Sequence, residues 1–446
     1  MSLDHPDCDP PPDTSDRTLR RGVGSLTRRR FLACSGVVAG AALAAGATQV
    51  QWHDLLAAAG ATPLDPSAGV LVVVALYGGN DGLNTVIPAD DPTYQRARPD
   101  LAYRADEVLD LGDGLGLNPG MTGLKALWDR DELAIVRGVG YPAFDHSHFR
   151  SMAIWQTASP ETPLPTGWLG RWLDASTTDP LDAVSLEPVL PALLAGSKLA
   201  AASFPLSGLK LPTGKLSRAF EMLGVASPED GPWQAAAAKS VADLKLAAST
   251  LGPAANTKPS VSPAPSTDPG SDSEDPNGGK GASAGGNAML DAQLQMVANL
   301  VEMGVPTRAY SVSLGGFDTY SDERGTQQRL LAELDAALSR FQARLDRTGR
   351  GRQVVTMVYS EFGRRVQANG SDGTDHGTAG PMFVLGRGVQ GGFHGAEPSL
   401  TDLDNGDLRA TTDFRSVYAT ILDQVLGADP GAVLGGWDQR VELLSG

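Results

Sequence analysis

Residues 354–386 read VVTMVYSEFGRRVQANGSDGTDHGTAGPMFVLG. The stretch opens on VVTMVY, a β-branched and apolar run of the kind that is buried in a parallel sheet, and the run stops at a carboxylate, Glu361. A polar, glycine-bearing loop at 367–373 leads to Asp375-His376-Gly377, and residues 381–385 read as another buried strand. Ligands of open α/β sheets bind beyond the carboxyl ends of the strands, so this stretch predicts a site as well as a fold.

The same alternation of strands and helices continues on both sides of this stretch. Apolar runs predict strands, and apolar residues at three-to-four spacing predict helices, one of them with Asp413 as N-cap. The spacing of Phe149, Met152 and Trp155 predicts one buried helix face. The order of elements predicts an α/β fold with a doubly wound, mostly parallel sheet flanked by helices. The predicted strands are 69–77, 133–139 and 307–314, with strands and loops in 181–207; the predicted helices are 149–155, 233–251, 330–345 and 413–426.

The first 47 residues have the features of an export signal. Thr27-Arg28-Arg29-Arg30-Phe31-Leu32 precedes a small and apolar run, 33–47, that contains no charge. This order predicts a signal of the twin-arginine type, and with it a periplasmic, cell-envelope or extracellular protein that engages the twin-arginine export machinery. The run of about 15 residues is too short to span a bilayer comfortably, so no stable membrane span is expected in the mature form.

Composition favours a large acidic domain without thiol chemistry. The chain has 446 residues, 41% of them hydrophobic, and a formal net charge of −16, which disfavours nucleic acid and anionic membranes as partners. Both cysteines lie in the predicted signal, so disulfides and thiolate metal sites are excluded from the mature chain. Residues 48–446 are expected to form one domain. Within it, residues 253–287 are rich in Pro, Ser, Gly and Asp and predict a disordered insertion.

Several predicted strand ends carry acidic or imidazole groups. Carboxylates mixed with imidazole suit a divalent ion such as Zn, Mn, Mg or Ca, or a two-metal site that holds a phosphoryl or sulfuryl group. Ser147 lies near a helix N-terminus, where backbone N–H groups favour an anion. The candidate ligands are Asp81, Asp318, Glu361, Asp375 and His376, and the candidate catalytic residues are Ser147 and Arg364, with Arg365 as the alternative to Arg364.

Each of these residues also has a structural interpretation. Asn-Asp-Gly around Asp81 is favourable turn chemistry, and Ser147 could serve as a helix cap. Glu361 could form an ion pair with one of the arginines that follow it. His146 and His148 could pack or make supporting hydrogen bonds. Asp375 and His376 have the least structural reason to occupy a glycine-rich loop.

Five separated segments together resemble the motifs of a twin-arginine-exported bacterial family, the domain of unknown function 1501 family. The likeness extends from about residue 69 to 427, apart from the insertion. That family in turn resembles the alkaline phosphatase and sulfatase superfamily. The segments are, in order, GGNDGLNTVIP (78–88), DHSHFRSMAIWQTA (145–158), GGFDTYSDERGTQQ (315–328), YSEFGRR (359–365) and DHGTAGPMFVLG (375–386).

The resemblance implies roles for individual residues. It implies that Asp81, Asp318 and His376 are metal ligands and that Ser147 is the nucleophile. Glu361 falls where the superfamily has an aspartate followed by histidine. Two departures accompany the likeness: Tyr320 stands where the family usually has a histidine, and Phe362 replaces a superfamily histidine. His146, His148 or His394 could substitute for the two missing imidazoles, and a tyrosine can itself ligate some metals.

Two functions follow from this pattern. The first is an exported metal-dependent hydrolase that acts on a phosphate or sulfate ester of a small molecule or polysaccharide, in which Arg364 or Arg365 stabilises developing negative charge. The alternative is a catalytically inactive, sulfatase-like scaffold or binding protein of the cell envelope. A phosphomutase or transferase is disfavoured, because phosphorylated metabolites are scarce outside the cytoplasm.

Overall fold

The computed structural model describes residues 47–50 and residues 63–444. Within the second range it leaves out 143, 145, 178, 188–189, 204–208, 213–224, 226–288 and 303. The described residues belong to one compact unit that spans 40–446. The predicted insertion at 253–287, the predicted helix at 233–251 and all but the last residue of the predicted signal lie outside the described residues. Within the described part of the chain, no helix is long and apolar enough to cross a membrane.

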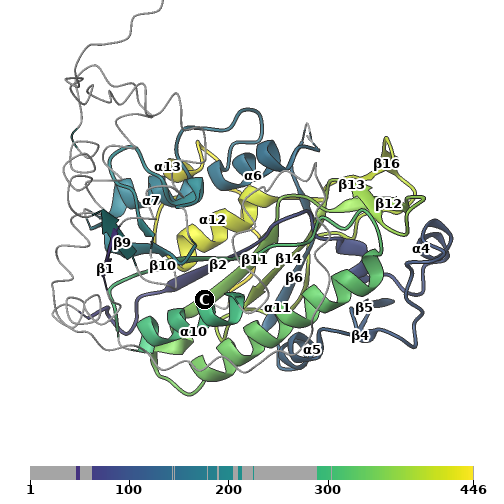
Figure 1. Cartoon of the computed structure of the whole chain (residues 1–446), viewed down its shortest axis with the longest axis horizontal. Coiled ribbons are helices and arrows are strands. Elements are labelled where there is room, and N and C mark those ends of the chain that lie inside the picture. Colours follow the sequence, from purple (N-terminus) through teal and green to yellow (C-terminus); the bar gives the residue numbers. More distant parts are fainter. Residues whose placement is uncertain are drawn as a thin grey trace, which may run out of the picture. The chain divides into compact units, whose positions relative to one another are not determined.

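A nine-stranded sheet forms the centre of this unit (Figure 1). Its order is β15-β6-β14-β11-β2-β10-β7-β8, and β18 pairs with β6. Only β14 runs antiparallel to its neighbours in this sheet, so the predicted mostly parallel α/β sheet is confirmed. The strands are β2 (Val70–Leu76), β6 (Leu133–Gly140), β7 (Ala183–Ser185), β8 (Ala202–Ser203), β10 (Ala309–Leu314), β11 (Val354–Ser360), β14 (Gly380–Leu385), β15 (Gly392–His394) and β18 (Thr412–Asp413).

Helices cover both faces of the sheet (Figure 1). One face packs against α5 (Thr122–Trp128), α10 (Met289–Glu302) and α11 (Glu323–Leu345). The other packs against α6 (His148–Thr157), α7 (Trp168–Ser176), α12 (Phe414–Gln424) and α13 (Pro430–Val433). Within the central strand β2, Val72 and Val74 belong to the first core, and Leu71 and Val73 belong to the second. This is the two-residue period of a strand that is buried on both faces.

Smaller elements extend the carboxyl edge of the sheet. A hairpin of β12 (Arg364–Ala368) and β13 (Thr374–His376) follows β11 directly. A second layer contains β3 (Val86–Ile87), α4 (Pro92–Ala97), β4 (Leu109–Gly112) and β5 (Leu115–Leu117), and β16 (Leu403–Asp404) pairs with β17 (Asp407–Leu408). Away from this edge, β1 (Ala47–Val50) pairs with β9 (Leu209–Pro212).

Two predictions about helices have opposite outcomes. Asp413 caps α12 as predicted, because its carboxylate accepts a hydrogen bond from the backbone N–H of Arg415. The predicted burial of Phe149 is wrong, since 78% of this residue is exposed. Phe149 lies among the first three residues of α6, none of which is buried, whereas Trp155, six residues later, is buried. Helical spacing therefore identified the correct face but not the point at which the core ends.

Candidate metal centre

Three loops and one helix end meet at the carboxyl edge of the central strands. The loops follow β2, β10 and β11, and the helix end is the N-terminus of α6. Two glycines in the loop after β2 allow the loops after β10 and β11 to pack closely against it. Gly78 has φ of 118°, and a Cβ there would lie 2.4 Å from the backbone nitrogen of Asp318. Gly79 has φ of 73°, and a Cβ there would lie 2.1 Å from the ring of Phe362. Only glycine fits both the backbone conformation and the space.

His148, Asp318 and His376 form a cluster at this edge that could hold a metal ion. Each residue offers one donor atom, and the three donors lie within 4.8 Å of one another. His148 Nε2 lies 3.4 Å from Asp318 Oδ2, and His376 Nε2 lies 3.3 Å from Asp318 Oδ1. Three donors about 2.1 Å from one tetrahedral ion would lie roughly 3.4 Å apart, so these separations fit a bound ion.

His148 is oriented by a buried carboxylate. Its Nδ1 lies 2.8 Å from Oε1 of Glu361, and because a carboxylate only accepts, Nδ1–H donates and Nε2 faces the cluster. Glu361 is held in turn by the backbone N–H of Gly78 at 2.9 Å and the hydroxyl of Ser360 at 3.0 Å. A carboxylate that fixes a histidine tautomer is the usual support behind a metal-bound imidazole.

The Nε2 atom of His148 is buried without a hydrogen-bond partner among the described residues. Its 3.4 Å approach to Asp318 is an ion-pair contact and does not meet hydrogen-bond geometry. Partial burial acts to lower the pKa of His148, but the close contact with Asp318, the hydrogen bond to Glu361 and the negative charges of both carboxylates outweigh it and raise the pKa to about 9. The surroundings therefore favour a positive charge at this nitrogen, which either a proton or a metal ion could supply.

His376 presents the same ring nitrogen from the opposite side. Its Nδ1 lies 2.7 Å from the backbone carbonyl oxygen of His146, so Nδ1–H donates and Nε2 faces Asp318. The rings of His148 and His376 lie edge to face with centroids 4.3 Å apart, and Phe362 packs against both. Phe362, at the position where the resemblance would place a histidine, thus serves as an apolar wall of the site.

Asp318 lies between the two histidines and is held ionised. Burial acts to raise its pKa, but the close contact with His148 and the hydrogen bonds with His376 and Arg364 hold the pKa well below its usual range. Arg364 donates to Asp318 Oδ1 at 2.8 Å and also to four backbone carbonyl oxygens, those of Gly78, Gly79, Phe317 and Thr374. Arg364 is buried and joins the three loops, so it positions Asp318.

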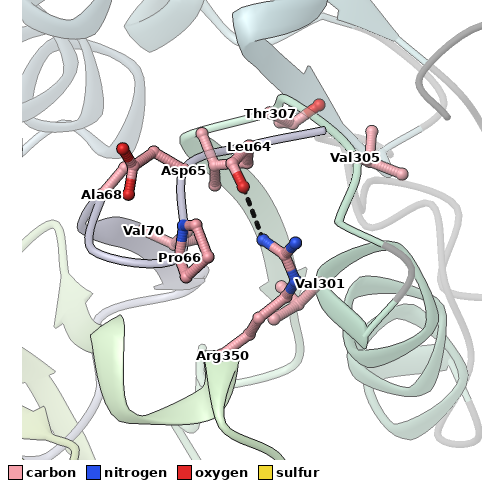
Figure 2. A pocket seen from close by; sticks show the side chains of 9 residues that line it. All are labelled: Leu64, Asp65, Pro66, Ala68, Val70, Val301, Val305, Thr307 and Arg350. Atoms are coloured by element: carbon pink, nitrogen blue, oxygen red, sulfur yellow. Dashed lines mark hydrogen bonds between the residues drawn. The ribbon is translucent and has the colours of Figure 1, made fainter. Parts of the chain in front are cut away.

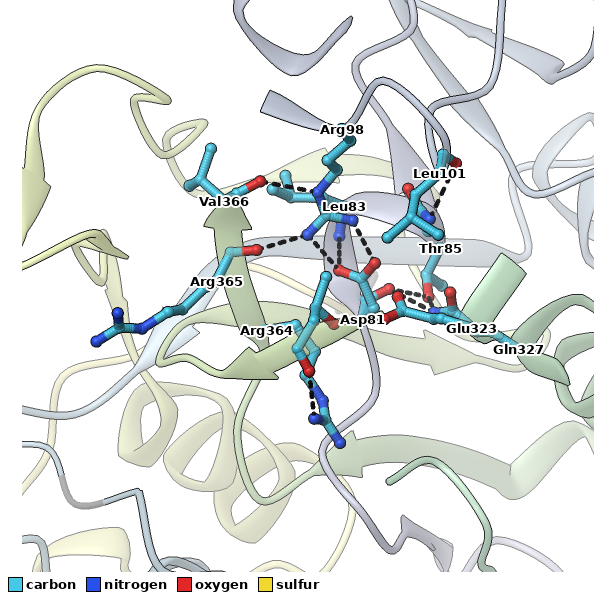
Figure 3. Close-up of polar contacts among 12 residues, drawn as sticks. Asp81, Leu83, Thr85, Arg98, Leu101, Glu323, Gln327, Arg364, Arg365 and Val366 are labelled. Carbon is cyan, nitrogen blue, oxygen red and sulfur yellow. Dashed lines mark hydrogen bonds and ion pairs between the residues drawn. The ribbon is translucent and has the colours of Figure 1, made fainter. Parts of the chain in front are cut away.

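Asp81 lies in a separate buried network (Figure 3). Its carboxylate forms an ion pair with Arg98 in which both side chains are fully buried, and it accepts a hydrogen bond from the backbone N–H of Leu83. Burial acts to raise the pKa of Asp81, and the charge of Arg98 outweighs it and lowers the pKa. Burial and repulsion from Asp81 raise the pKa of neighbouring Glu323, so Glu323 is the protonated member of this carboxyl pair.

The remaining predicted residues occupy different positions. The side chain of Asp375 contacts Asn369 at 3.3 Å and is outside the cluster. Ser147 is the exposed N-cap residue of α6, directly before His148, but its hydroxyl makes no capping hydrogen bond. His394 Nε2 contacts the carbonyl oxygen of Gln390. Asp145 lies outside the described residues.

The sequence therefore identified two of the three clustered residues, Asp318 and His376. Glu361, predicted as a ligand, supports His148, and no ion pair links it to Arg364 among the described contacts. The third clustered residue, His148, was predicted only as a possible substitute for a missing imidazole. The sequence feature that could have identified His148 is its position at the start of a predicted helix that follows a strand, because this places it at the same edge of the sheet as the other loops.

Two small recesses lie near opposite edges of the sheet. Figure 2 shows the first, which is lined by Val70 at the amino end of β2 and by Arg350, whose guanidinium donates to the carbonyl oxygen of Leu64 at 2.6 Å. The second is lined by Ser360, Phe362 and Trp155 and adjoins the cluster through the ring of Phe362. The second recess therefore lies on the same side of the sheet as the cluster.

Fold and site together define an α/β protein with a two-histidine, one-aspartate centre at the carboxyl edge of a mostly parallel sheet. The model of a family described as "Protein of unknown function (DUF1501)" matches residues 68–444, and the chain belongs to this family. No curated protein matches the sequence.

Solved structures with a similar fold are distant. A protein in the alkaline phosphatase superfamily from Vibrio parahaemolyticus is 10% identical, with a TM-score of 0.39 over 86% of this chain and 77% of that one. Phosphonoacetate hydrolase from Sinorhizobium meliloti, in complex with phosphonoformate, is 13% identical, with a TM-score of 0.27 over 67% of this chain and 57% of that one. At this distance, inference about the site rests on the residues of this chain.

Proposed function

We propose that this protein is an exported, metal-dependent hydrolase of phosphate or sulfate esters. The observation that carries the proposal is the convergence of His148, Asp318 and His376, with the buried Nε2 of His148 lacking a hydrogen-bond partner among the described residues. A polar atom buried without a partner is costly, and a bound ion would offset that cost. The donor set suits zinc or manganese better than magnesium or calcium, because two donors are imidazoles.

Residues in and around the cluster would have different roles in catalysis. His148, Asp318 and His376 would hold the ion, which when bound would act as a Lewis acid on the ester oxygen. Glu361 would keep His148 in its binding tautomer, and Arg364 would keep Asp318 in place. Because Arg364 already donates to Asp318 and four carbonyl groups, and the guanidinium of Arg365 pairs with Asp407, we assign the stabilisation of developing charge to the α6 N-terminus.

Ser147 would be the nucleophile. It is exposed, it is adjacent to His148 in the chain, and it occupies the N-cap of a ten-residue helix, where backbone N–H groups stabilise an anionic group. Its Oγ would form the new bond to phosphorus or sulfur while the alcohol oxygen of the ester leaves with a proton. Water would then release phosphate or sulfate and restore the hydroxyl group.

The test combines metal analysis with an ester panel. The full chain is produced in a host that exports it, purified without chelator, and assayed with p-nitrophenyl phosphate, p-nitrophenyl sulfate and bis(p-nitrophenyl) phosphate. We expect about one equivalent of metal and turnover of at least one ester, with both lost in His376→Ala. His394→Ala is the matched control, because this histidine lies outside the cluster, and it should change neither.

One observation favours the non-catalytic alternative. Asp81, which the resemblance assigned to metal binding, is engaged by Arg98, so the described residues offer a single three-donor cluster. A scaffold or binding protein of the envelope needs no second ion. Bound metal without turnover of any ester, or with turnover unchanged in Ser147→Ala, would contradict the hydrolase mechanism and favour the scaffold.

A further inference from the structure

Tyr320 reaches the metal cluster from the loop after β10. Its hydroxyl oxygen lies 2.5 Å from Nε2 of His376, the nitrogen that also faces Asp318 at 3.3 Å. Because Nδ1 of His376 donates to a carbonyl group, this Nε2 carries the lone pair that a metal would use. The phenol oxygen therefore lies beside the donor atoms of the cluster and not on the outer surface of the loop.

Neighbouring groups hold Tyr320 in this orientation. The side-chain amide of Asn369 donates to the Tyr320 carbonyl oxygen at 3.1 Å. The loop is tight at Gly373, where a Cβ would lie 2.2 Å from the Tyr320 carbonyl group. The ring of Tyr320 packs against that of His376 with centroids 5.1 Å apart, and the guanidinium of Arg364 lies 5.2 Å from the Tyr320 ring centroid. Contacts of the backbone with Asn369 and of the ring with His376 and Arg364 thus fix the position of the phenol group.

Tyr320 also differs from the other tyrosines of the chain. All eight tyrosines are described, and Tyr320 is the exposed one, at 43%. An ordinary core role therefore does not explain it. Part of the side chain is exposed, while its hydroxyl oxygen lies against His376.

We propose that Tyr320 is the fourth protein ligand of the ion held by His148, Asp318 and His376. It binds as a phenolate: the metal–oxygen bond forms as the hydroxyl proton leaves to solvent, and His376 Nε2 exchanges its contact with the hydroxyl for one with the ion. A phenolate added to two imidazoles and a carboxylate makes the donor set suitable for iron, including its harder trivalent state, as well as for zinc. The inference rests on the proposed metal centre but not on hydrolysis.

Visible absorption spectroscopy can detect a metal-bound phenolate directly. A phenolate bound to ferric iron gives a charge-transfer band in the visible range, which carboxylate and imidazole ligands do not give. Purified full-chain protein is stripped with a chelator, reloaded with ferric nitrilotriacetate and examined by absorption and by elemental analysis. We expect one visible band for each bound iron, lost in Tyr320→Phe and in Tyr320→His.

Tyr103→Phe is the matched control. The Tyr103 hydroxyl lies outside the cluster and makes only long contacts of 3.4 and 3.5 Å, so this variant should keep the band. The inference is overturned if iron binds to the wild type without a band, if Tyr320→Phe keeps the band, or if the wild type binds no iron. Ester turnover with zinc that is unchanged in Tyr320→Phe would remove Tyr320 from the site while leaving the hydrolase proposal intact.

Discussion

At the scale of single residues, each clustered histidine owes its chemistry to the partner of its second ring nitrogen. Glu361 accepts from Nδ1 of His148, and the backbone carbonyl of His146 accepts from Nδ1 of His376. Both Nε2 atoms are therefore available to a common ligand. Neither partner lies near its histidine in the sequence: Glu361 and His148 are separated by 213 positions, and His376 and His146 by 230.

Glu361→Gln tests the support of His148. The amide still fills the space, but it removes the negative charge that faces Nδ1 and can no longer accept at both oxygens. We expect metal affinity to fall by about 10- to 100-fold, the usual effect of losing such a partner. Competition with a chromophoric chelator measures it. Glu132→Gln, at the opposite end of the sheet in a surface contact with Arg130, should leave affinity unchanged; equal affinity in Glu361→Gln would contradict the role of Glu361.

The raised pKa of His148 leads us to expect that the free energy of unfolding of the metal-free protein depends on pH. The pKa of this histidine is raised from 6.5 to about 9 in the folded state, so its stabilisation is complete below about pH 6.5 and is lost as pH rises through about 9. Denaturant unfolding of chelator-treated protein should show a falling free energy of unfolding across this interval. In His148→Gln the fall should be smaller. An equal slope in both proteins would show that the proton on His148 does not contribute.

At the scale of elements, Arg98 joins the end of α4 to the β12 strand. Its guanidinium donates to the carbonyl oxygens of Arg365 and Val366 as well as to Asp81. Arg98→Met removes the cation and leaves the Asp81 carboxylate buried beside Glu323. We expect a loss of about 3–5 kcal/mol in the free energy of unfolding, because breaking a buried pair strands one charge. The exposed pair of Arg104 and Asp106 provides the control: Arg104→Ala should have no measurable effect.

Asp81→Asn separates a structural aspartate from a metal ligand. The geometry predicts a less stable protein, because the pair with Arg98 is lost, with unchanged metal content at saturating metal. Elemental analysis and denaturant unfolding on the same sample give both quantities. Loss of one metal equivalent from a protein that remains folded would restore Asp81 to the ligand set that the resemblance implied.

At the scale of the whole molecule, the chain combines a predicted signal with a large α/β unit that has a polar carboxyl edge. The export prediction concerns Arg28 and Arg29. The double variant Arg28→Lys/Arg29→Lys should remain in the cytoplasm, because twin-arginine recognition requires the guanidinium pair. Cell fractionation followed by immunoblotting measures how much of each variant is exported. The pair Arg20 and Arg21, which Gly-Val-Gly-Ser follows, supplies the control. Equal export of both double variants would contradict the twin-arginine assignment.

The sequence alone determined the fold class and the edge of the sheet at which polar groups gather. Strands β2, β10 and β11 are continuous β-branched and apolar runs, and both α11 and α12 carry apolar residues at helical spacing, so local periodicity was sufficient to place them. Asp318 and His376 were identified for the same reason, since each follows a recognisable strand or a glycine-rich loop. The predicted twin-arginine signal is likewise a local pattern, and it stays a prediction.

Only the tertiary structure decided which of the gathered side chains meet. Asp81 and Asp318 follow neighbouring parallel strands, yet one pairs with Arg98 and the other lies between His148 and His376. The difference depends on a guanidinium delivered by α4 and on a helix end delivered by α6, contacts that span from 17 to 170 positions of sequence. Periodicity reports the burial of a face, whereas the partner of a charged side chain depends on packing among segments that are distant in sequence.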